Sequence, residues 1–561
     1  MDAEVAHGGV YMSLLSQVEG LYYDRKYLDI HELTKELWTQ SDIPDNLTLE
    51  ELVWGGRVAE RLGSKILAYR LLSKARSIDE ENPLVQLYSF SSVSRARGVL
   101  GLLDHYEHQP YLESTEPRHS LYWTVGHALI RASLRDFTYA NRLLEEAEQW
   151  KDCDRPWLDY AWAELAYGKD DWITAKKLSD KAFSAQPKIY HNLQLRGRIA
   201  VRNNTLPSFL EEMQQTIADS QCINFAILYI HHLCVQAERL DRTACEPLLS
   251  NAWKTCATLN HLVPLADKRM NAQLATVRLD VARLMRNEEA MLEQARKLKT
   301  EYHIQLAENL QKNRGKQIWI CTHAPLWQAH NTCLPSSVGT LFPDVDTGQL
   351  TNDLTYGGTD ITDCLNWLKN KTPIVGVPFI ADSESARRLL RNGIGFIYLT
   401  GGDNWAHAMA AIGLDDVTRE LIIHCPSSER AIRLPLDELK RNVGDFGPQC
   451  VALVKADRLA FVKELIPESQ REPYAAFLTF QNVVYHLGKN DGADICGKLQ
   501  EKYPDHPFSK RVKARFHLRK NKIEDAVVIL EDLLRSNPEN LYLRMDLLEA
   551  FNRCQNSVRQ L

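Results

Sequence analysis

Hydrophobic residues recur at intervals of three and four along the first part of the chain, from about residue 10 to residue 312. This spacing places apolar side chains on one face of a helix, so it predicts one amphipathic helix after another. The same spacing returns from residue 458 to the C-terminus. We therefore expect two helical regions, 1–312 and 458–561, on either side of a different kind of domain.

The pattern changes between residues 316 and 457. Short apolar runs rich in β-branched residues appear there, separated by Gly and Asp-Asp turns: PIVGVPFI, GIGFIYLTG, WAHAMAAIGLDD, RELIIHCP and QCVALVKAD. A helical stretch, ITDCLNWLKNK, precedes the first of them. Runs of this length and composition are typical of strands. The fold class we predict is therefore mostly α, with an α+β domain inserted at 316–457.

A repeat underlies the helical regions. Small residues seven apart, followed by a Pro, occur in WITAKKLSDKAFSAQP (Ala175, Ala182, Pro187), and IEDAVVILEDLLRSNP has the same spacing. Similar pairs lie one and about three repeats earlier, at Ala140/Ala147 and Ala68/Ala75. Small residues on one helix face let a paired helix approach closely. A period of about 34 residues with this signature resembles the tetratricopeptide repeat, although other α-solenoids share such features.

Tetratricopeptide-type repeats stack into a superhelix whose concave face commonly binds peptides or proteins. The resemblance therefore implies a protein partner on the helical arms, or a helical scaffold alone. The formal charge of −6 is small and there is no basic tract, so nucleic acid is not expected as the main ligand. No apolar run is long enough for a membrane span, and the acidic N-terminal residues do not resemble a secretory signal.

The twelve cysteines are scattered, without CxxC pairs or metal-ligand spacing. This usage favours reduced thiols in the cytoplasm over a disulfide framework. One of the cysteines has a distinctive setting. In QAHNTCLPSSVGTLF, residues 328–342, Thr332 is a helix-capping type and Pro335 suits a first helical turn. Cys333 would then begin a helix, where the positive end of the helix dipole favours the reactive thiolate.

A nucleophilic cysteine also needs a base, most often histidine. His407 opens the strand in DNWAHAMAAIGLDD, whose other residues are mostly apolar and small. Packing explains an imidazole poorly at that position, whereas a side chain directed at a site explains it well. We therefore expect the Cys333 thiol within about 4 Å of a ring nitrogen of His407.

The order of these features resembles a known family. Gln328 precedes Cys333 by five residues, and a helix and the PIVGVPF strand follow. Next come the His407 strand, which ends in Gly-x-Asp-Asp, and a strand that ends in x-Pro-Ser. This order is similar to that of the bacteriocin-processing (double-glycine) peptidases, which have a papain-like cysteine peptidase fold. The resemblance extends to RLPLDELKRN.

The resemblance implies a role for each matched residue. Cys333 would be the nucleophile and His407 its general base. Gln328 would donate its side-chain amide to the oxyanion, together with the backbone N–H of Cys333. The substrate would be a peptide or protein, and no cofactor or metal is implied. The function so predicted is a cysteine peptidase or related acyl-transfer enzyme.

Two positions depart from the family pattern. The family usually has Gly after its Cys, and this chain has Leu334. The family's third catalytic residue is the Asp of an Asp-Pro pair, and the aligned pair here is Cys425-Pro426. A neutral thiol stabilises an imidazolium less than a carboxylate does. We still expect Cys425 to lie beside His407, because the strand pattern and Pro426 are retained.

The sequence leaves several ways to orient His407. The Cys–His pair could work unaided, the site could have changed its chemistry, or another side chain could substitute. The nearest candidates are Asp403 and Asn404. Asp415 and Asp416 lie beyond the far end of the His407 strand, so they are poorer candidates.

Two further hypotheses remain open. Cys333, His407 and Cys425 could bind zinc if His330 or His424 supplied a fourth ligand, although closely spaced ligand pairs are missing. The papain-like domain could also be catalytically inactive, within a scaffold for protein–protein interaction. The missing Asp at position 425 is the main support for that second hypothesis.

Overall fold

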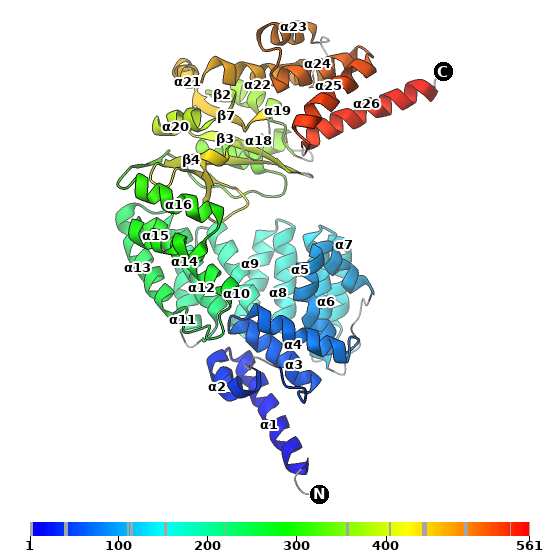
Figure 1. The fold of residues 1–561 in the computed structure, drawn as a ribbon, viewed down its shortest axis with the longest axis vertical. Helices are drawn as coiled ribbons and strands as arrows, with labels where there is room; N and C mark the ends of the chain where they lie inside the picture. The colour runs from blue at the N-terminus through cyan, green and yellow to red at the C-terminus, as the bar shows by residue number, and fades with distance from the viewer. Residues whose placement is uncertain are drawn as a thin grey trace. The chain divides into compact units, whose positions relative to one another are not determined.

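The computed structural model divides the chain into two compact units, Met1–Ala307 and Glu308–Leu561 (Figure 1). No helix among the described residues is long and apolar enough to cross a membrane. The described residues are 4–38, 43–108, 112, 116–150, 154–218, 220–354, 358–402, 405–439, 446–486, 492–538 and 540–559.

The described part of the first unit consists of helices, and the last of them continues into the second unit. The helices are α1 (Glu4–Tyr23), α2 (Tyr27–Trp38), α3 (Leu49–Arg61), α4 (Lys65–Ile78), α5 (Pro83–His108), α6 (Pro117–Ser133), α7 (Phe137–Glu148), α8 (Arg155–Gly168), α9 (Trp172–Ala185), α10 (Tyr190–Arg202), α11 (Leu206–Ile217), α12 (Ile223–Ala237), α13 (Arg242–Thr258), α14 (Lys268–Met285), α15 (Glu288–Leu298) and α16 (Glu301–Lys312). Many begin at an Asp, Asn or Ser whose side chain accepts a backbone N–H of the first turn, as Asp171 does at α9.

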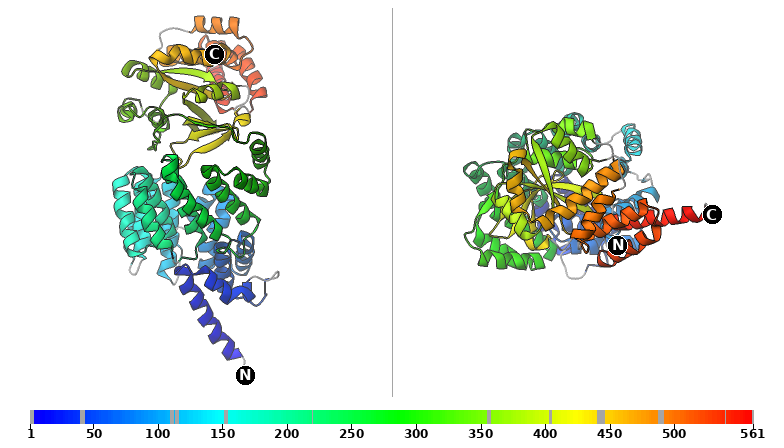
Figure 2. Two further views of the ribbon diagram at one scale, coloured as in Figure 1. Left: turned by 90° about the vertical axis from the view of Figure 1, so that its left-hand side faces the viewer. Right: turned by 90° about the horizontal axis from the view of Figure 1, so that it is seen from above.

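Successive helices of this unit pack in pairs, including α3 with α4, α6 with α7 and α8 with α9. Figure 2 (left) shows several of the cyan and green helices standing side by side. The predicted small-residue pairs on the second helix of each pair are all buried: Ala68 and Ala75, Ala140 and Ala147, Ala175 and Ala182. A methyl group at these positions lets the paired helix approach closely. The prediction of a helical-repeat region is confirmed.

The repeat region also folds back on itself. The turn after α3 pairs with the loop before α14: the Leu265 N–H donates to the Leu62 carbonyl (3.1 Å), and the Asp267 N–H donates to the Gly63 carbonyl (3.2 Å). Gly63 has a φ of +98°, and a Cβ atom there would collide with Val263. Segments about 200 residues apart are thereby joined within the first unit.

The second unit contains all the described strands. Its elements up to the last strand are β1 (Ile318–Ile320), α17 (Cys333–Leu341), α18 (Thr347–Leu354), α19 (Ile361–Lys371), β2 (Ile374–Ile380), α20 (Ser383–Arg391), β3 (Phe396–Gly402), β4 (Trp405–Asp415), β5 (Glu420–His424), β6 (Ile432–Pro435) and β7 (Gln449–Lys455). The helices after it are α21 (Leu459–Leu465), α22 (Glu468–Gln481), α23 (Ala493–Lys502), α24 (Pro507–Arg519), α25 (Ile523–Ser536) and α26 (Leu541–Arg559). The division into domains at 316 and 457 stays a prediction.

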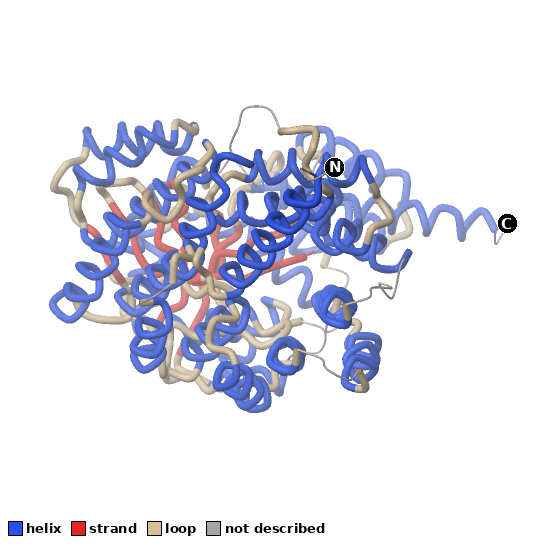
Figure 3. Tube along the Cα trace, turned by 90° about the horizontal axis from the view of Figure 1, so that it is seen from below, coloured by secondary structure: helices blue, strands red, loops and turns tan. Residues whose placement is uncertain are grey.

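The strands form one antiparallel sheet in the order β2-β7-β3-β4-β5-β6, and β1 pairs with the end of β4. Figure 3 shows these strands in red among blue helices. Alternate residues of β4 face opposite sides. Ala408, Ala410 and Ile412 pack with α17 and α19, whereas Ala411 and Leu414 pack with α20. The sheet is therefore buried on both faces, which explains its nearly continuous apolar strands.

The C-terminal helices enclose a buried ion cluster. The Asp546 carboxylate accepts hydrogen bonds from Arg511 Nε (2.7 Å) and Arg515 Nη2 (2.6 Å). Burial opposes ionisation of Asp546, but Arg511 and Arg515 outweigh it and lower the carboxyl pKa. The stability that this shift contributes is present above the unfolded pKa, near 4, and is lost as the pH falls through the lowered pKa.

Replacing Asp546 with Asn should destabilise the second unit by about 3–5 kcal/mol, because the buried Arg511 and the partly buried Arg515 lose their counter-charge. Chemical denaturation of the full chain at neutral pH measures the change. Asp532→Asn is the matched control, since Asp532 pairs with Lys510 and Arg535 in an exposed setting and should change stability by about 0.5 kcal/mol or less. Equal effects of the two substitutions would contradict the expectation.

Candidate functional site

Helix α17 begins at Cys333, as the sequence pattern predicted. Thr332 occupies the N-cap position, but its hydroxyl donates to the Ala329 carbonyl (3.0 Å) and does not cap the first turn. Ser337 and the residues around it are small and buried, so the helix lies close to the sheet. The Cys333 side chain is partly exposed at the edge of the core that α17 shares with β4.

The direction of α17 places Cys333 at the end of β4 that carries His407. The Ser337 hydroxyl donates to the Ala408 carbonyl (3.0 Å). One turn later, the Leu341 side chain lies beside Gly395, which is next to the Ala411 carbonyl. The helix thus runs along β4 in the direction of increasing residue number. Cys333 lies one turn before Ser337, so it lies toward His407.

Cys425 also lies at this end of the sheet. It follows β5 directly, and its Sγ is 3.1 Å from Nε2 of His407. The antiparallel pairing of Ala410 with His424 sets this position, because Cys425 then follows opposite Met409, two residues from His407 along β4. Cys425 is buried, and its Sγ is also 2.9 Å from the hydroxyl of Ser427. The structure therefore places the Cys425 thiol in contact with the His407 ring.

The segment before α17 is hydrogen-bonded to the end of β5 that lies next to Cys425. The Gln328 N–H donates to the Pro426 carbonyl (3.0 Å), and a ring nitrogen of His424 lies 3.0 Å from the Leu326 carbonyl. The rings of Trp327 and His424 meet edge to face at 5.1 Å. These contacts bring Gln328 to Cys425 and Pro426, and its side-chain oxygen is buried. Gln328 and His407 thus approach Cys425 from separate segments, and α17 begins with Cys333 toward the same end of β4.

The protonation state of His407 follows from its surroundings. Burial lowers the pKa of the imidazole below its ordinary value, because the charged form loses hydration. The ring is therefore neutral at neutral pH and can accept a proton. Since Nε2 faces Cys425, Nδ1 is the nitrogen placed for a second partner.

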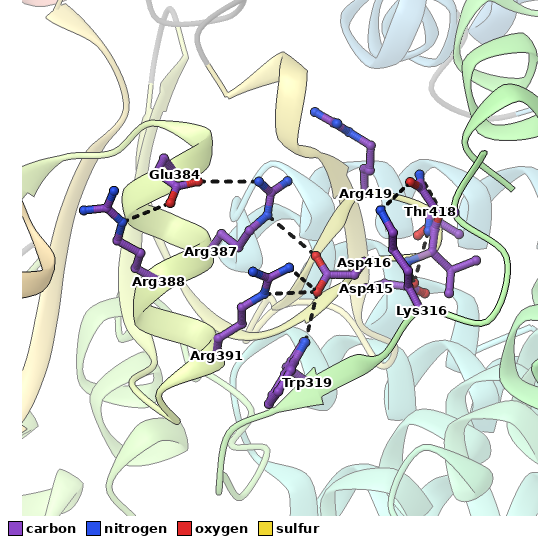
Figure 4. A network of polar contacts seen from close by, with 12 residues as sticks. Lys316, Trp319, Glu384, Arg387, Arg388, Arg391, Asp415, Asp416, Thr418 and Arg419 are labelled. Atoms are coloured by element: carbon purple, nitrogen blue, oxygen red, sulfur yellow. Dashed lines mark hydrogen bonds and ion pairs between the residues drawn. The ribbon is translucent and has the colours of Figure 1, made fainter.

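Asp415 and Asp416 do not orient His407. Both lie at the far end of β4, where Asp415 pairs with Glu420 of β5. Figure 4 shows where Asp416 is directed: its Oδ2 accepts from Trp319 Nε1 (3.0 Å) and Arg391 Nη2 (2.7 Å). The sequence had already made Asp415 and Asp416 the poorer candidates to orient His407, because they lie beyond the far end of its strand.

The Asp415 side chain stabilises the turn that follows β4. Its Oδ1 accepts the backbone N–H groups of Val417 and Thr418 at 3.0 and 3.1 Å. The other two candidate orienters, Asp403 and Asn404, lie outside the described residues. Cys425 is therefore the described side chain that meets His407 Nε2.

The zinc hypothesis gains no support from the geometry. Among the described residues, the ligand atoms of Cys333, His407 and Cys425 do not all lie within 4.8 Å of one another. His330 is exposed, and one ring nitrogen of His424 faces the Leu326 carbonyl. The arrangement suits proton transfer between side chains better than metal ligation.

Sequence reasoning missed the contribution of Ser427. Its hydroxyl lies 2.9 Å from Cys425 Sγ and either atom can donate the proton. The only signal in the sequence is its place two residues after Cys425, in the turn CPSS. Ser427 adds a second polar neighbour to the thiol that faces His407.

No protein-family model matches the sequence, and no curated protein is similar to it. A tetratricopeptide repeat protein from Parabacteroides merdae is 13% identical over 46% of this chain and 98% of its own, with a TM-score of 0.27. A monomeric IFIT1 mutant with Gppp-AAAA is 12% identical over 53% of this chain and 70% of its own, with a TM-score of 0.31. The APC/C hetero-tetramer Cut9–Hcn1 is 8% identical over 95% of both chains, with a TM-score of 0.19. Likenesses this low assign no function.

Proposed function

We propose that residues 316–457, within the second unit, form a papain-like domain that acts as a cysteine peptidase or a related acyl-transfer enzyme on peptide or amide bonds. The observation that supports this most is the contact of Cys425 with His407 Nε2, at 3.1 Å. In the proposed site Cys425 would take the third position, beside a Cys333 that begins α17 toward the same end of β4. Neutral His407 and a thiol at a helix start are the two groups that thiol acyl transfer requires.

In this mechanism the Cys333 thiol gives its proton to Nδ1 of His407. The thiolate attacks the substrate carbonyl, and the oxyanion that forms accepts hydrogen bonds from the Gln328 amide and the Cys333 N–H. The carbon–nitrogen bond then breaks as the imidazolium protonates the leaving amine. Water, deprotonated by His407, or another nucleophile attacks the thioester and regenerates the thiol.

The helical-repeat regions would bind a protein partner or hold the substrate protein. Repeat units of this kind present extended surfaces to peptides and proteins. Holding a substrate near the site raises its effective concentration, so the site itself can make few specific contacts. A reducing compartment such as the cytoplasm would keep Cys333 as a thiol.

A second candidate function is an interaction scaffold in which this domain is catalytically inactive. The observation that favours it is the identity of residue 425. A cysteine side chain at position 425 stabilises imidazolium less than a carboxylate does, so the His407 ring is a poorer acid and base partner for Cys333. The scaffold hypothesis predicts no acyl transfer at Cys333.

Formation of an acyl-enzyme distinguishes the two functions. The full chain would be treated with a peptide aryl ester, and the acylated cysteine identified by mass spectrometry. We expect selective acylation of Cys333 and its loss in Cys333→Ala. Cys245, which is also partly exposed, is the control thiol within the same chain. Acylation of Cys333 no faster than that of Cys245 would contradict the enzyme and favour the scaffold.

Replacing Cys425 with Asp should raise the rate of Cys333 alkylation by iodoacetamide by about tenfold at mildly acidic pH. The carboxylate would stabilise imidazolium and raise the His407 pKa, so that the thiolate–imidazolium pair persists to lower pH. The measurement is the pH profile of alkylation, with Cys425→Asn as the control of similar size without charge. If both variants react at the wild-type rate, another residue already orients His407.

A further inference from the structure

A cluster of arginines and aromatic rings lies inside the first unit, far in sequence from Cys333. The guanidinium of Arg57, on α3, lies over three rings: Tyr88 at 3.9 Å, Trp54 at 4.0 Å and Tyr22 at 4.4 Å from their centres. Its Nη1 is buried and has no hydrogen-bond partner among the described residues. A buried N–H of a charged group that lacks an acceptor is costly, so the charge of this guanidinium is incompletely compensated.

Two more arginines join this cluster. Arg61, one turn after Arg57 on α3, donates from Nε to the Tyr22 hydroxyl (3.3 Å). Arg25, in the turn between α1 and α2, donates to the Tyr27 hydroxyl (3.2 Å). The rings of Tyr22 and Tyr27 meet at 5.3 Å and connect the three arginines.

The cluster lacks a counter-charge. No carboxylate among the described residues lies within ion-pair distance of Arg25, Arg57 or Arg61; their polar and charged neighbours are mainly tyrosines and Cys222. Burial alone would raise the pKa of Tyr22, but Arg61, Arg57 and Arg25 outweigh it and lower the pKa to about 8. The positive charges of the three arginines thus favour the ionised form of the Tyr22 phenol.

Other segments of the first unit surround the arginine cluster but leave part of it exposed. Arg25 also donates from Nη2 to the Lys188 carbonyl (3.1 Å), across 163 residues of sequence, and the Gln221 side chain accepts the Leu28 N–H (2.8 Å). These contacts hold α1 and α2 against the segment around α10 and α12. Arg25, Arg57 and Arg61 each remain partly exposed, so an incoming group can reach them.

We propose that Arg25, Arg57 and Arg61 form a binding site for a phosphate group in the helical-repeat unit. A phosphate monoester carries a charge of about −1.5 to −2 at neutral pH, which offsets three guanidinium groups better than the single charge of a carboxylate. Its oxygens match the fixed donor geometry of guanidinium. The site is independent of the Cys333 chemistry and would serve to recognise a phosphorylated partner or a free phosphate.

Calorimetric titration of the full chain with inorganic phosphate, at ionic strength held constant with sodium chloride, tests this. We expect saturable binding at one site, weakened about ten- to a hundredfold in Arg57→Gln. Arg142→Gln is the matched control, because Arg142 also stacks on a ring, Tyr139 at 4.3 Å, but lies on the exposed surface. If Arg57→Gln does not fold, Arg25→Gln replaces it, with the same expectation.

Parallel titrations separate the sources of the phosphate. A phosphoserine peptide that binds more tightly than inorganic phosphate indicates a phosphorylated protein partner, whereas equal affinities indicate a free phosphate. Absence of saturable phosphate binding by the wild-type chain would overturn the proposal. Unchanged affinity in the arginine variants, or tighter binding of a glutamate-rich peptide than of phosphate, would overturn it as well.

Discussion

Replacing His407 with Ala should slow acylation of Cys333 by a peptide aryl ester by about a hundred- to ten-thousandfold, the range of positioned general acid–base catalysis. The neutral imidazole accepts the thiol proton in our proposal, and alanine leaves the thiol to ionise in water. Alkylation of Cys333 by iodoacetamide should slow as well, because both reactions need the thiolate. The measurement is the rate of each reaction, by mass spectrometry of the Cys333 peptide.

A matched control for this variant is His323→Ala. His323 is also partly buried in the second unit, and its Nδ1 lies 2.8 Å from the Cys321 carbonyl, away from Cys425. It should leave both rates unchanged. Wild-type rates in His407→Ala would show that Cys333 reacts without this base, and the proposed catalytic pair would then be wrong.

Replacing Gln328 with Ala should lower the rate of Cys333 acylation by about a hundred- to a thousandfold. The proposed role of the Gln328 amide is to stabilise the oxyanion of the tetrahedral intermediate. Alkylation by iodoacetamide forms no such oxyanion, so its rate should stay at the wild-type value. The ratio of the two rates in one preparation therefore isolates the oxyanion contribution from damage to the fold.

Gln349→Ala serves as the control, because Gln349 is an exposed glutamine of the same unit that donates to Asp353 (2.6 Å). Both rates should be unchanged in that variant. A parallel loss of acylation and alkylation in Gln328→Ala would assign Gln328 to positioning Cys333 rather than to the oxyanion. No loss of either would remove Gln328 from the site.

The pattern of the sequence was sufficient to predict the helical regions and most strands of the sheet, but it missed β1 and β6. Small residues seven apart, such as Ala175 and Ala182, mark the close face of a helix pair wherever they occur. Short β-branched runs likewise identified the strands β2 to β5 and β7. These signals depend on residues close together in the chain, so they can be read without knowing the tertiary structure. The start of α17 at Cys333 is of the same kind, since Pro335 in the first turn acts locally, although the Thr332 hydroxyl does not cap the helix.

The papain-like assignment has a different basis, because it rests on the order of motifs and stays a proposal. The sequence names Gln328, Cys333, His407 and Cys425 as candidates, but their spacing along the chain does not fix distances between separate segments. The distance of 3.1 Å between His407 and Cys425 depends on how β4 and β5 pair. A shift of one residue in that pairing would turn one of the two side chains to the opposite face.

The tertiary structure alone decided two further features. Asp416 follows the His407 strand, yet its partners are Trp319 and Arg391, because β1 and α20 meet at the far end of β4. The cluster of Arg25, Arg57 and Arg61 forms where α1, α2 and α3 meet residues 188–222. Periodicity fixes which face of a helix is buried, but contacts between distant segments follow from how helices and strands pack, and local patterns do not contain that information.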